Sequence, residues 1–362
     1  MKYGFRNIIY CTLAYDPAIP SGANRRAREL CTRFDRQFGA AFELIIAKGK
    51  RPPGLTRAMV HEIDYKPKSI LGRLSAKRQI GHILRCHSPA IFVNEFLPIP
   101  FRSIKEHLHF QVVYDLRYFT DNQTLRQRLM YTLPIKAQWS RSERLVACSE
   151  FTKHELVRLC GCRPENILIS NFAIDGKLLQ QPEWEPRKDI DILFVGHFEK
   201  RKNHANLLRA LAIVDKGLRV EFIGVDNGLK TELELLARQL GISNVQFLTL
   251  NDDQTLWDYY RRARLFVFPS NYEGFGIPLI ESLALGTPVA CSDIPVFREI
   301  GGNLVDYFNQ HDPEHMADVI SKALHNPRTP SRRELHDVLC RYLWDSIYES
   351  FVHDLLAVSA PA

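Results

Sequence analysis

Short apolar runs alternate with longer amphipathic runs along the chain, which is the pattern of a parallel α/β fold. The clearest example begins with an apolar run of strand length at residues 265–268, which ends at Pro269. A mostly apolar helical run follows between Pro278 and Gly286, and a second apolar run starts at Val289. Pro suits the first turn of a helix and Gly suits its end, so this stretch predicts a strand, a loop, a helix and a strand. Such a loop lies at the carboxyl end of a parallel strand, where doubly wound sheets bind ligands.

The same alternation over 362 residues predicts two doubly wound, Rossmann-like domains. The expected strands are the apolar runs 8–13, 42–46, 90–93, 111–114, 144–148, 190–195, 220–224 and 245–250. A polar, Pro-rich run at residues 181–188 predicts a linker. We therefore expect an N-terminal domain over residues 1–180, a C-terminal domain over residues 181–330 and a helical tail over residues 331–362.

Charge is distributed unevenly between the two halves of the chain. Residues 1–180 carry 29 Lys and Arg against 15 Asp and Glu, whereas the whole chain has a net charge of only +7. Such a split indicates that the first half meets an anionic partner. Basic residues crowd two segments with helical character, residues 66–85 and 125–144. These segments either form solvated basic faces or dock on an anionic membrane surface, and the sequence leaves both interpretations open.

Composition argues against several classes of protein. No apolar run approaches the roughly 20 residues of a membrane-spanning helix, and the short run at residues 7–15 is better explained as a first buried strand than as a signal peptide. The eight Cys form no paired C-x2-C motifs, so we expect reduced cytosolic thiols and no zinc or other metal site. His107 and His109 have no acidic partner in the pattern and are interpreted as non-ligands. No nucleic-acid-binding signature is present, so no nucleic acid partner is expected.

Candidate chemistry gathers in the loop before the helix at Pro278. Glu273 lies between Tyr272 and Gly274, and Gly276 follows two residues later. Glycines at these positions let a ligand approach the backbone closely, and the N–H groups of Gly276 and Ile277 at a helix N-terminus suit phosphate or sugar oxygens. Glu281 lies eight residues after Glu273. A carboxylate favoured by the helix dipole is the alternative explanation of Glu281.

The run PSNYEGFGIP at residues 269–278, together with Glu281, resembles the Glu-x7-Glu signature of retaining glycosyltransferases of the GT-B fold. More narrowly, it resembles family 4 (group 1), whose members use nucleotide-sugar donors. The resemblance implies two doubly wound domains facing a central cleft, with C-terminal helices that cross back to the N-terminal domain. It also implies that Glu273 meets the donor sugar hydroxyls, that Glu281 meets the ribose hydroxyls, and that Phe275, Gly276 and Ile277 line the donor site.

A second element of the C-terminal half resembles the family's Gly-x5-Lys motif. Gly196 follows an expected strand and precedes the basic run KRK at residues 200–202. The resemblance implies that Arg201 and Lys202 neutralise the departing diphosphate without a metal; a solvated charge run is the alternative. The family places the nucleobase beside Thr249 and Leu250.

The N-terminal half carries weaker similarities. Gly22 lies in a loop that resembles the family's N-terminal glycine loop, although an ordinary βα turn explains it equally well. Tyr114 stands where relatives commonly have a catalytic-site His, so the role of that His is carried over to Tyr114 as a hypothesis. Ser149 is expected to cap a helix.

The resemblance implies a retaining, metal-independent hexosyltransferase without a cofactor. We expect it to move a sugar, best assigned as mannose from GDP-mannose, to a glycan or lipid-linked acceptor in surface polysaccharide biosynthesis (lipopolysaccharide, O-antigen or capsule). It is expected in the cytoplasm, and docking on the inner face of the plasma membrane is one of the two interpretations of its basic segments. The alternatives are a non-catalytic GT-B partner subunit and a nucleotide-sugar epimerase.

Overall fold

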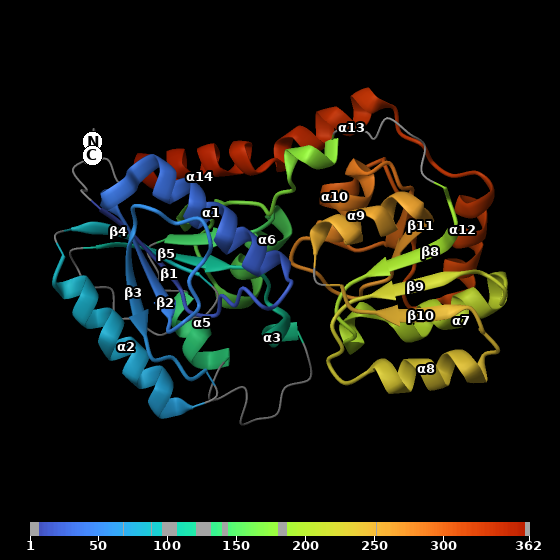
Figure 1. The fold of residues 1–362 in the computed structure, drawn as a ribbon, viewed down its shortest axis with the longest axis horizontal. Coiled ribbons are helices and arrows are strands. Elements are labelled where there is room, and N and C mark those ends of the chain that lie inside the picture. Colours follow the sequence, from blue (N-terminus) through green and yellow to red (C-terminus); the bar gives the residue numbers. More distant parts are fainter. Residues whose placement is uncertain are drawn as a thin grey trace. The chain divides into compact units, whose positions relative to one another are not determined.

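The chain divides into two compact units (Figure 1). The computed structural model describes residues 7–67, 69–87, 89–95, 107–120, 132–139, 144–179, 187–250 and 252–358. The N-terminal unit comprises Met1–Ala173 and Trp344–Ala362, and the C-terminal unit comprises Ile174–Leu343. These boundaries differ from those expected after residues 180 and 330. The chain passes between the two units next to Ile174 and again after Tyr342. The Ile174 N–H donates to the Tyr342 carbonyl at 2.8 Å, and this hydrogen bond joins the two segments within the C-terminal unit. Most of the expected linker lies outside the described residues.

The N-terminal unit is built on a seven-stranded sheet in the order β3-β2-β1-β4-β5-β6-β7. Every paired strand in it is parallel. The order reverses between β1 and β4, which makes their carboxyl ends the topological switch point. In chain order the described strands and α-helices are β1 (Asn7–Thr12), α1 (Gly22–Phe38), β2 (Phe42–Ala47), β3 (Met59–Ile63), α2 (Ile70–Arg85), β4 (Ala90–Asn94), β5 (Leu108–Val113), α3 (Arg117–Thr120), α5 (Leu133–Trp139), β6 (Arg144–Ala147), α6 (Glu150–Cys160), β7 (Ile167–Ile169) and α14 (Trp344–Val358).

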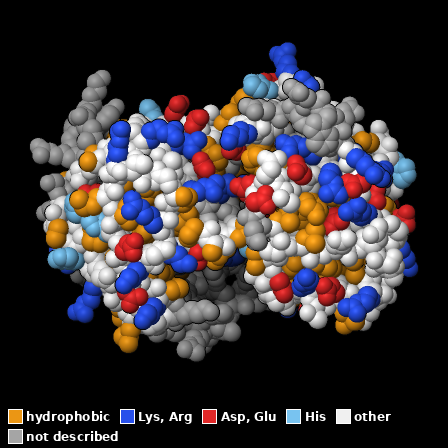
Figure 2. Space-filling view, in the orientation of Figure 1, with side chains coloured by type: hydrophobic (Ala, Val, Ile, Leu, Met, Phe, Trp, Pro, Cys, Tyr) orange, Lys and Arg blue, Asp and Glu red, His pale blue; other side chains and the backbone are white. Residues whose placement is uncertain are grey.

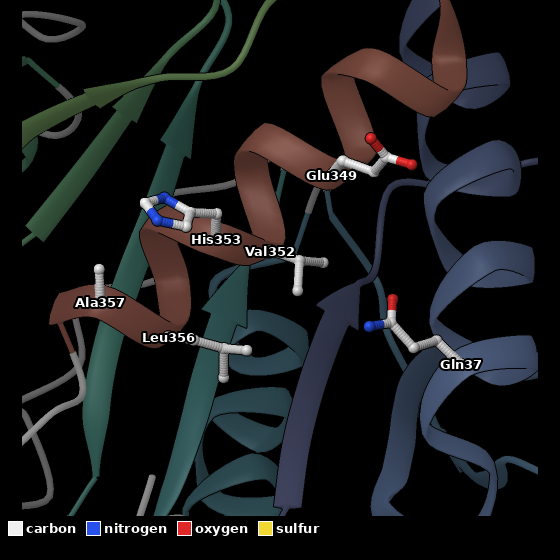
Figure 3. A pocket seen from close by; sticks show the side chains of 6 residues that line it. All are labelled: Gln37, Glu349, Val352, His353, Leu356 and Ala357. Carbon is white, nitrogen blue, oxygen red and sulfur yellow. The ribbon is translucent and has the colours of Figure 1, made fainter. Parts of the chain in front are cut away.

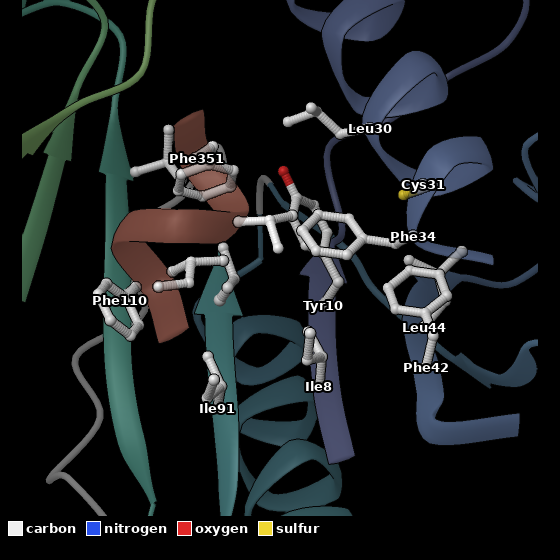
Figure 4. Close-up of a cluster of buried hydrophobic side chains, with 14 of the residues drawn as sticks. Ile8, Tyr10, Leu30, Cys31, Phe34, Phe42, Leu44, Ile91, Phe110 and Phe351 are labelled. Carbon is white, nitrogen blue, oxygen red and sulfur yellow. The ribbon is translucent and has the colours of Figure 1, made fainter. Parts of the chain in front are cut away.

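Helices bury both faces of this sheet, which explains why its central strands read as continuous apolar runs. On one face, Phe34 of α1 stacks on Phe42 of β2 with ring centroids 5.4 Å apart (Figure 4). Tyr348 of α14 meets Phe34 edge-on, with ring centroids 5.2 Å apart. On the other face, α2 contributes Ala76, Ile80 and Leu84 to a second buried cluster. The C-terminal helix α14 is therefore a core element of the N-terminal unit.

Local patterns predicted most of these elements, with two informative exceptions. Strand β3 was not expected, because it lies at the sheet edge and Met59 is 57% exposed, so it lacks a buried apolar run. The helix expected over residues 66–85 begins at Ile70, since the Ser69 side chain caps its N-terminus by accepting from the Gly72 N–H. Ser149 caps α6 as expected. Much of the basic segment 125–144 lies outside the described residues.

The C-terminal unit has a six-stranded parallel sheet in the order β10-β9-β8-β11-β12-β13. Its order reverses between β8 and β11, so their carboxyl ends form the switch point of this unit. The two parallel sheets with interleaved helices confirm the predicted α/β fold class. The described strands and α-helices are β8 (Ile190–Val195), α7 (His204–Val214), β9 (Val220–Ile223), α8 (Lys230–Gln239), β10 (Val245–Leu248), α9 (Asp253–Arg262), β11 (Ala263–Phe268), α10 (Ile277–Ala284), β12 (Val289–Ser292), α11 (Pro295–Gly301), β13 (Asp306–Phe308), α12 (Pro313–His325) and α13 (Arg332–Leu339).

None of the helices in the described ranges combines the length and apolarity needed to cross a bilayer.

A close backbone contact beside this switch point makes Gly224 irreplaceable. A Cβ at Gly224 would lie 2.0 Å from the carbonyl oxygen of Gly196, which is backbone and unable to rotate away. We expect Gly224→Ala to lower the free energy of unfolding of the C-terminal unit by about 3 kcal/mol or more, because the ends of β8 and β9 must separate. Gly176→Ala is the matched control, since a Cβ there meets nothing within 4 Å. Urea unfolding of both variants checks this, and equal stability would contradict the prediction.

Candidate active site

The loops after β8 and β11 bring together residues that are about 70 positions apart in sequence. After β8 the chain passes Gly196 and forms a short 3-10 helix, η5 (Lys200–Lys202). After β11 it runs through the loop containing Glu273 to α10. The Asn271 N–H donates to the Arg201 carbonyl at 2.8 Å, which holds the two loops together. The candidate site therefore lies at the switch point of the C-terminal sheet.

Glu273 is the centre of this site. Its Oε1 accepts from the Lys202 ammonium at 2.6 Å, and its Oε2 pairs with the Arg201 guanidinium at 2.8 Å. The Ser270 hydroxyl also donates to Oε1, at 2.8 Å. Arg201 in turn pairs with Glu199 at 2.6 Å. Glu273 and Lys202 are both buried, so the predicted trio of Glu273, Lys202 and Arg201 is assembled in one place.

Charge and burial oppose each other at Glu273. Burial by itself would raise the pKa of this carboxyl, but the charges of Arg201 and Lys202 and the hydrogen bonds from Lys202 and Ser270 lower it to about 2. Burial lowers the pKa of Lys202, and Glu273 partly compensates. The Lys202 ammonium also lies 5.0 Å from the centroid of the Phe268 ring, a cation–π distance. At neutral pH Glu273 is therefore ionised.

These ion pairs predict a pH dependence of stability. Because the folded-state pKa of Glu273 lies below its ordinary value of 4.5, its stabilising contribution is present above pH 4.5 and is lost as the pH falls toward 2. A shift of this size corresponds to about 3 kcal/mol, of which about 2 kcal/mol should disappear between pH 6 and pH 3. Urea unfolding at several pH values should show this loss in the wild type and a correspondingly smaller loss in Glu273→Gln. Identical pH profiles would contradict the assignment.

Glu281 occupies a different position from Glu273. It is buried on α10, and its Oε2 accepts from the Tyr260 hydroxyl of α9 at 3.3 Å. The structure thus separates the two glutamates of the predicted signature: Glu273 is held by the basic residues, and Glu281 is held against a neighbouring helix.

The remaining predicted donor-site residues surround the same sheet edge. Gly276 is the N-cap of α10 with φ 126°, and a Cβ there would lie 2.9 Å from the Phe297 ring, so this position requires glycine. Ile277 is the first residue of α10, and Phe275 is buried with its ring 5.5 Å from that of Tyr342.

The predicted residues after β8 and β10 contact neighbouring loops of the same sheet. A Cβ at Gly196 would approach the Lys202 side chain to 3.4 Å. Thr249 and Leu250 follow β10, where the Thr249 hydroxyl donates to the Gly224 carbonyl at 2.9 Å.

The N-terminal unit holds the other predicted residues at its own switch point. Tyr114 follows β5, and its hydroxyl donates to Glu95, which follows β4. Glu95 also pairs with Arg26 of α1 at 3.2 Å, and neither side chain is exposed. Burial, together with the Glu95 charge, raises the pKa of Tyr114, so the hydroxyl stays protonated and donates. Gly22 begins α1, whose N-terminus is capped by the Ser21 hydroxyl. A catalytic role for Tyr114 and a donor contact at Gly22 stay predictions.

Sequence reasoning missed three residues of these clusters. Ser270 stands three residues before Glu273 and looks like part of a turn, and Arg26 looks like one of several basic residues on an amphipathic helix. Glu95 ends a strand and had no visible partner. Only its place directly after a buried strand could have drawn attention to it.

A pocket elsewhere in the N-terminal unit is distinct from these clusters. It lies between α1 and α14 (Figure 3) and contains no predicted site residue. Its lining residues are Gln37, Glu349, Val352, His353, Leu356 and Ala357.

Known proteins share this fold and parts of this sequence. Residues 177–337 match the family model of glycosyl transferases group 1. The chain is 33% identical over 211 residues to a D-inositol 3-phosphate glycosyltransferase of Streptosporangium roseum, covering 51% of this chain and 48% of the relative. It is 25% identical over 205 residues to the O-antigen chain mannosyltransferase B of Escherichia coli, covering 53% of each. The chain thus spans about half the length of these curated relatives.

Likeness to a solved structure extends over nearly the whole chain. The structure of Anabaena HepE in complex with UDP and glucose matches with a TM-score of 0.78 and 15% identity, covering 97% of this chain and 100% of that one. Two doubly wound parallel units with these neighbours define the GT-B fold class. Within that class, residues 177–337 are similar to the group 1 glycosyltransferases, and this part of the chain lies in the C-terminal unit.

Proposed function

We propose that this protein is a retaining glycosyltransferase that moves a sugar from a nucleoside-diphosphate donor to an acceptor hydroxyl without a metal. The observation that carries the proposal is the cluster of buried Glu273 and Lys202 with half-buried Arg201 at the switch point between β8 and β11. Two cations beside a carboxylate, at the sheet edge where α/β folds bind ligands, suit the transfer of a group whose leaving partner is a diphosphate.

The ion pairs of this cluster suggest how its residues act. Glu199 and Glu273 balance the charges of Arg201 and Lys202, so the cluster carries no net charge before the donor binds. Diphosphate oxygens are expected to draw Lys202 and Arg201 away from Glu273 as the negative charge on the leaving group grows. The freed Glu273 carboxylate then accepts hydrogen bonds from sugar hydroxyls. In this proposal Glu273 positions Lys202 and Arg201 before the donor binds, and both cations then pair with the departing diphosphate.

The donor assignment is GDP-mannose, and the acceptor is a glycan or lipid-linked precursor of a surface polysaccharide. The O-antigen mannosyltransferase among the relatives supports this choice. The inositol phosphate glycosyltransferase and the UDP complex of the neighbour make other donors the principal alternatives. A thermal-shift screen of nucleotides decides between them, because a ligand that binds only the folded state raises the melting temperature. A shift with UDP and none with GDP would refute the GDP-mannose assignment.

One assay tests the activity itself. The protein is incubated with a panel of nucleotide sugars, and nucleotide release is measured with and without a polyprenyl-diphosphate-linked acceptor. Release that depends on the acceptor is expected. Release without any acceptor would favour the epimerase, and no release with any donor or acceptor would favour a non-catalytic partner subunit.

We further propose that the N-terminal unit docks on the anionic inner face of the plasma membrane, with α2 as the contact. Leu71 and Leu74 on this helix are 78% and 51% exposed, and Arg78 and Arg85 are exposed farther along it. Figure 2 shows Lys and Arg side chains spread over the visible face of this unit, with hydrophobic side chains between them. Exposed leucines beside cations suit an interfacial helix.

Vesicle co-sedimentation tests this docking. Binding to anionic vesicles should exceed binding to neutral ones and should weaken between about 0.1 M and 1 M salt, over which the Debye length falls from about 10 Å to about 3 Å. Leu71→Ser combined with Leu74→Ser should weaken binding, whereas Leu235→Ser, at a leucine 53% exposed on α8, should leave it unchanged. Equal sedimentation with both vesicle types, or none with either, would refute the proposal.

A further inference from the structure

A second cluster of titratable groups lies in the N-terminal unit, away from the candidate active site. Glu43 of β2, His61 of β3 and His87, which follows α2, offer three ligand atoms that lie within 4.8 Å of one another. The Nε2 atoms of His61 and His87 lie 2.7 and 2.9 Å from the same oxygen of Glu43, Oε2. Three segments that are distant in sequence therefore converge on one point.

The surroundings orient two of these groups as a metal site would require. His87 Nδ1 lies 2.6 Å from the Ile83 carbonyl oxygen, which only accepts, so Nδ1 must carry a hydrogen. Nε2 is then the ring nitrogen left to bind a metal, and it faces Glu43. The Asn7 amide donates to the other oxygen of Glu43, Oε1, at 2.9 Å. Metal-binding His and carboxylate groups are oriented by outer hydrogen bonds of this kind.

Burial differs across the cluster in a way that leaves one side open. The Glu43 side chain is 4% exposed, whereas the His61 and His87 side chains are 22% and 19% exposed. The buried Glu43 carboxylate is thus held by the Asn7 amide, while the two imidazoles border solvent. They have room for the shift of about half an ångström that opens these hydrogen bonds to metal–ligand spacing. An ion could enter from the solvent side and keep a water as its fourth ligand.

We infer that Glu43, His61 and His87 form a binding site for a divalent transition-metal ion, with Zn²⁺ as the ion that fits best. Two imidazole nitrogens and one carboxylate oxygen are a donor set typical of tetrahedral zinc with one open position. Hard ions such as Mg²⁺ prefer octahedral sites made of oxygen ligands, so they fit poorly. The ion would join the edge strand β3, its neighbour β2 and the turn between α2 and β4 (Figure 1).

Within the N-terminal sheet, this site lies at the opposite ends of the strands from Glu95 and Tyr114. Glu43 is the second residue of β2, near its amino end, whereas Glu95 and Tyr114 follow the carboxyl ends of β4 and β5. All paired strands of this sheet run parallel. The Glu43 cluster therefore lies toward the amino ends of the strands, whereas Glu95 and Tyr114 lie at the carboxyl ends. The inference is therefore independent of the proposed sugar transfer, and metal binding at this edge leaves that reaction metal-independent.

A competition titration tests the inference. Full-length protein without an affinity tag is stripped with a chelator and titrated with Zn²⁺ against a chromophoric chelator. One tight equivalent per chain is expected in the wild type. His61→Gln and His87→Gln should each weaken it by at least about 100-fold, since losing a ligand should cost no less than losing one of its outer hydrogen-bond partners. Mg²⁺ should not compete.

His325→Gln is the matched control. His325 Nδ1 contacts the Ser321 carbonyl at 2.7 Å near the end of α12, the same backbone contact that His87 makes, but His325 belongs to no such cluster among the described residues. This variant should bind Zn²⁺ like the wild type. Unchanged affinity in both His61→Gln and His87→Gln would overturn the inference, as would an absence of tight binding in the wild type.

A spectroscopic measurement on the wild type covers the case in which the variants fail to fold. Co²⁺ bound in place of Zn²⁺ should give the intense visible bands of a tetrahedral site, and they should vanish when one equivalent of Zn²⁺ is added. A weak octahedral spectrum would overturn the inference without any variant.

Discussion

Replacing Lys202 with alanine should lower kcat by about 100- to 1000-fold, the usual effect of losing one preorganised contact to a developing charge. Lys202 is only 6% exposed and its ammonium faces Glu273 at the switch point. Its charge matters most in the transition state, where the diphosphate departs, so kcat should fall much more than donor KM rises.

Lys200→Ala provides the matched control for this variant. Lys200 lies two residues earlier in the same 3-10 helix but is exposed. Both variants remove one lysine charge from the same turn, so non-specific electrostatics should affect them alike. Initial rates over a range of donor concentrations separate kcat from KM. A well-folded Lys202→Ala enzyme with the kcat of Lys200→Ala would remove Lys202 from the mechanism.

The pattern of apolar runs predicted the fold well because parallel strands buried on both faces leave a strong local signal. The strands β1, β8 and β11 are buried in this way and were located within a residue or two. Strand β3 was missed because the edge of a sheet needs no apolar run. The boundaries of the two units differ from the expected ones because Ile174 pairs with Leu343, and these two chain segments meet only in the folded structure.

The sequence indicated which side chains lie together where a motif constrains the backbone, and it gave little indication where distant segments converge. The glycines around Glu273, between β11 and α10, indicated that this carboxylate lies in a loop that a ligand can approach. The basic run after β8 indicated that Lys202 lies near a bound anion. The one local signal at Glu95 was its place directly after β4, and nothing local marked the cluster around Glu43. His107 and His109, two residues apart, attract attention in the sequence, yet His107 precedes β5 and its ring nitrogens contact the Ala90 N–H and the Leu84 carbonyl. His61 and His87 are 26 positions apart and meet in the fold.

Glu273→Gln should lower kcat by roughly 100-fold without raising donor KM, since the carboxylate is proposed to act on the sugar where positive charge develops. The neutral amide would also leave Lys202 and Arg201 without their shared counter-charge before the donor binds. Two unbalanced cations bind a diphosphate more strongly, so KM should stay constant or fall. This combination distinguishes a loss of transition-state contact from a general loss of donor affinity.

Glu281→Gln gives the contrasting result that makes the comparison decisive. Glu281 is held by Tyr260 rather than by the basic residues, and a ribose contact is the same in the ground state and the transition state. We therefore expect a higher donor KM with a nearly unchanged kcat. Both variants replace a buried Glu with Gln within one loop-helix unit, and thermal unfolding reports whether each is folded. If both variants changed KM alone and to the same extent, the two glutamates would share one role in donor binding, and the assignment of Glu273 to the reacting sugar would be wrong.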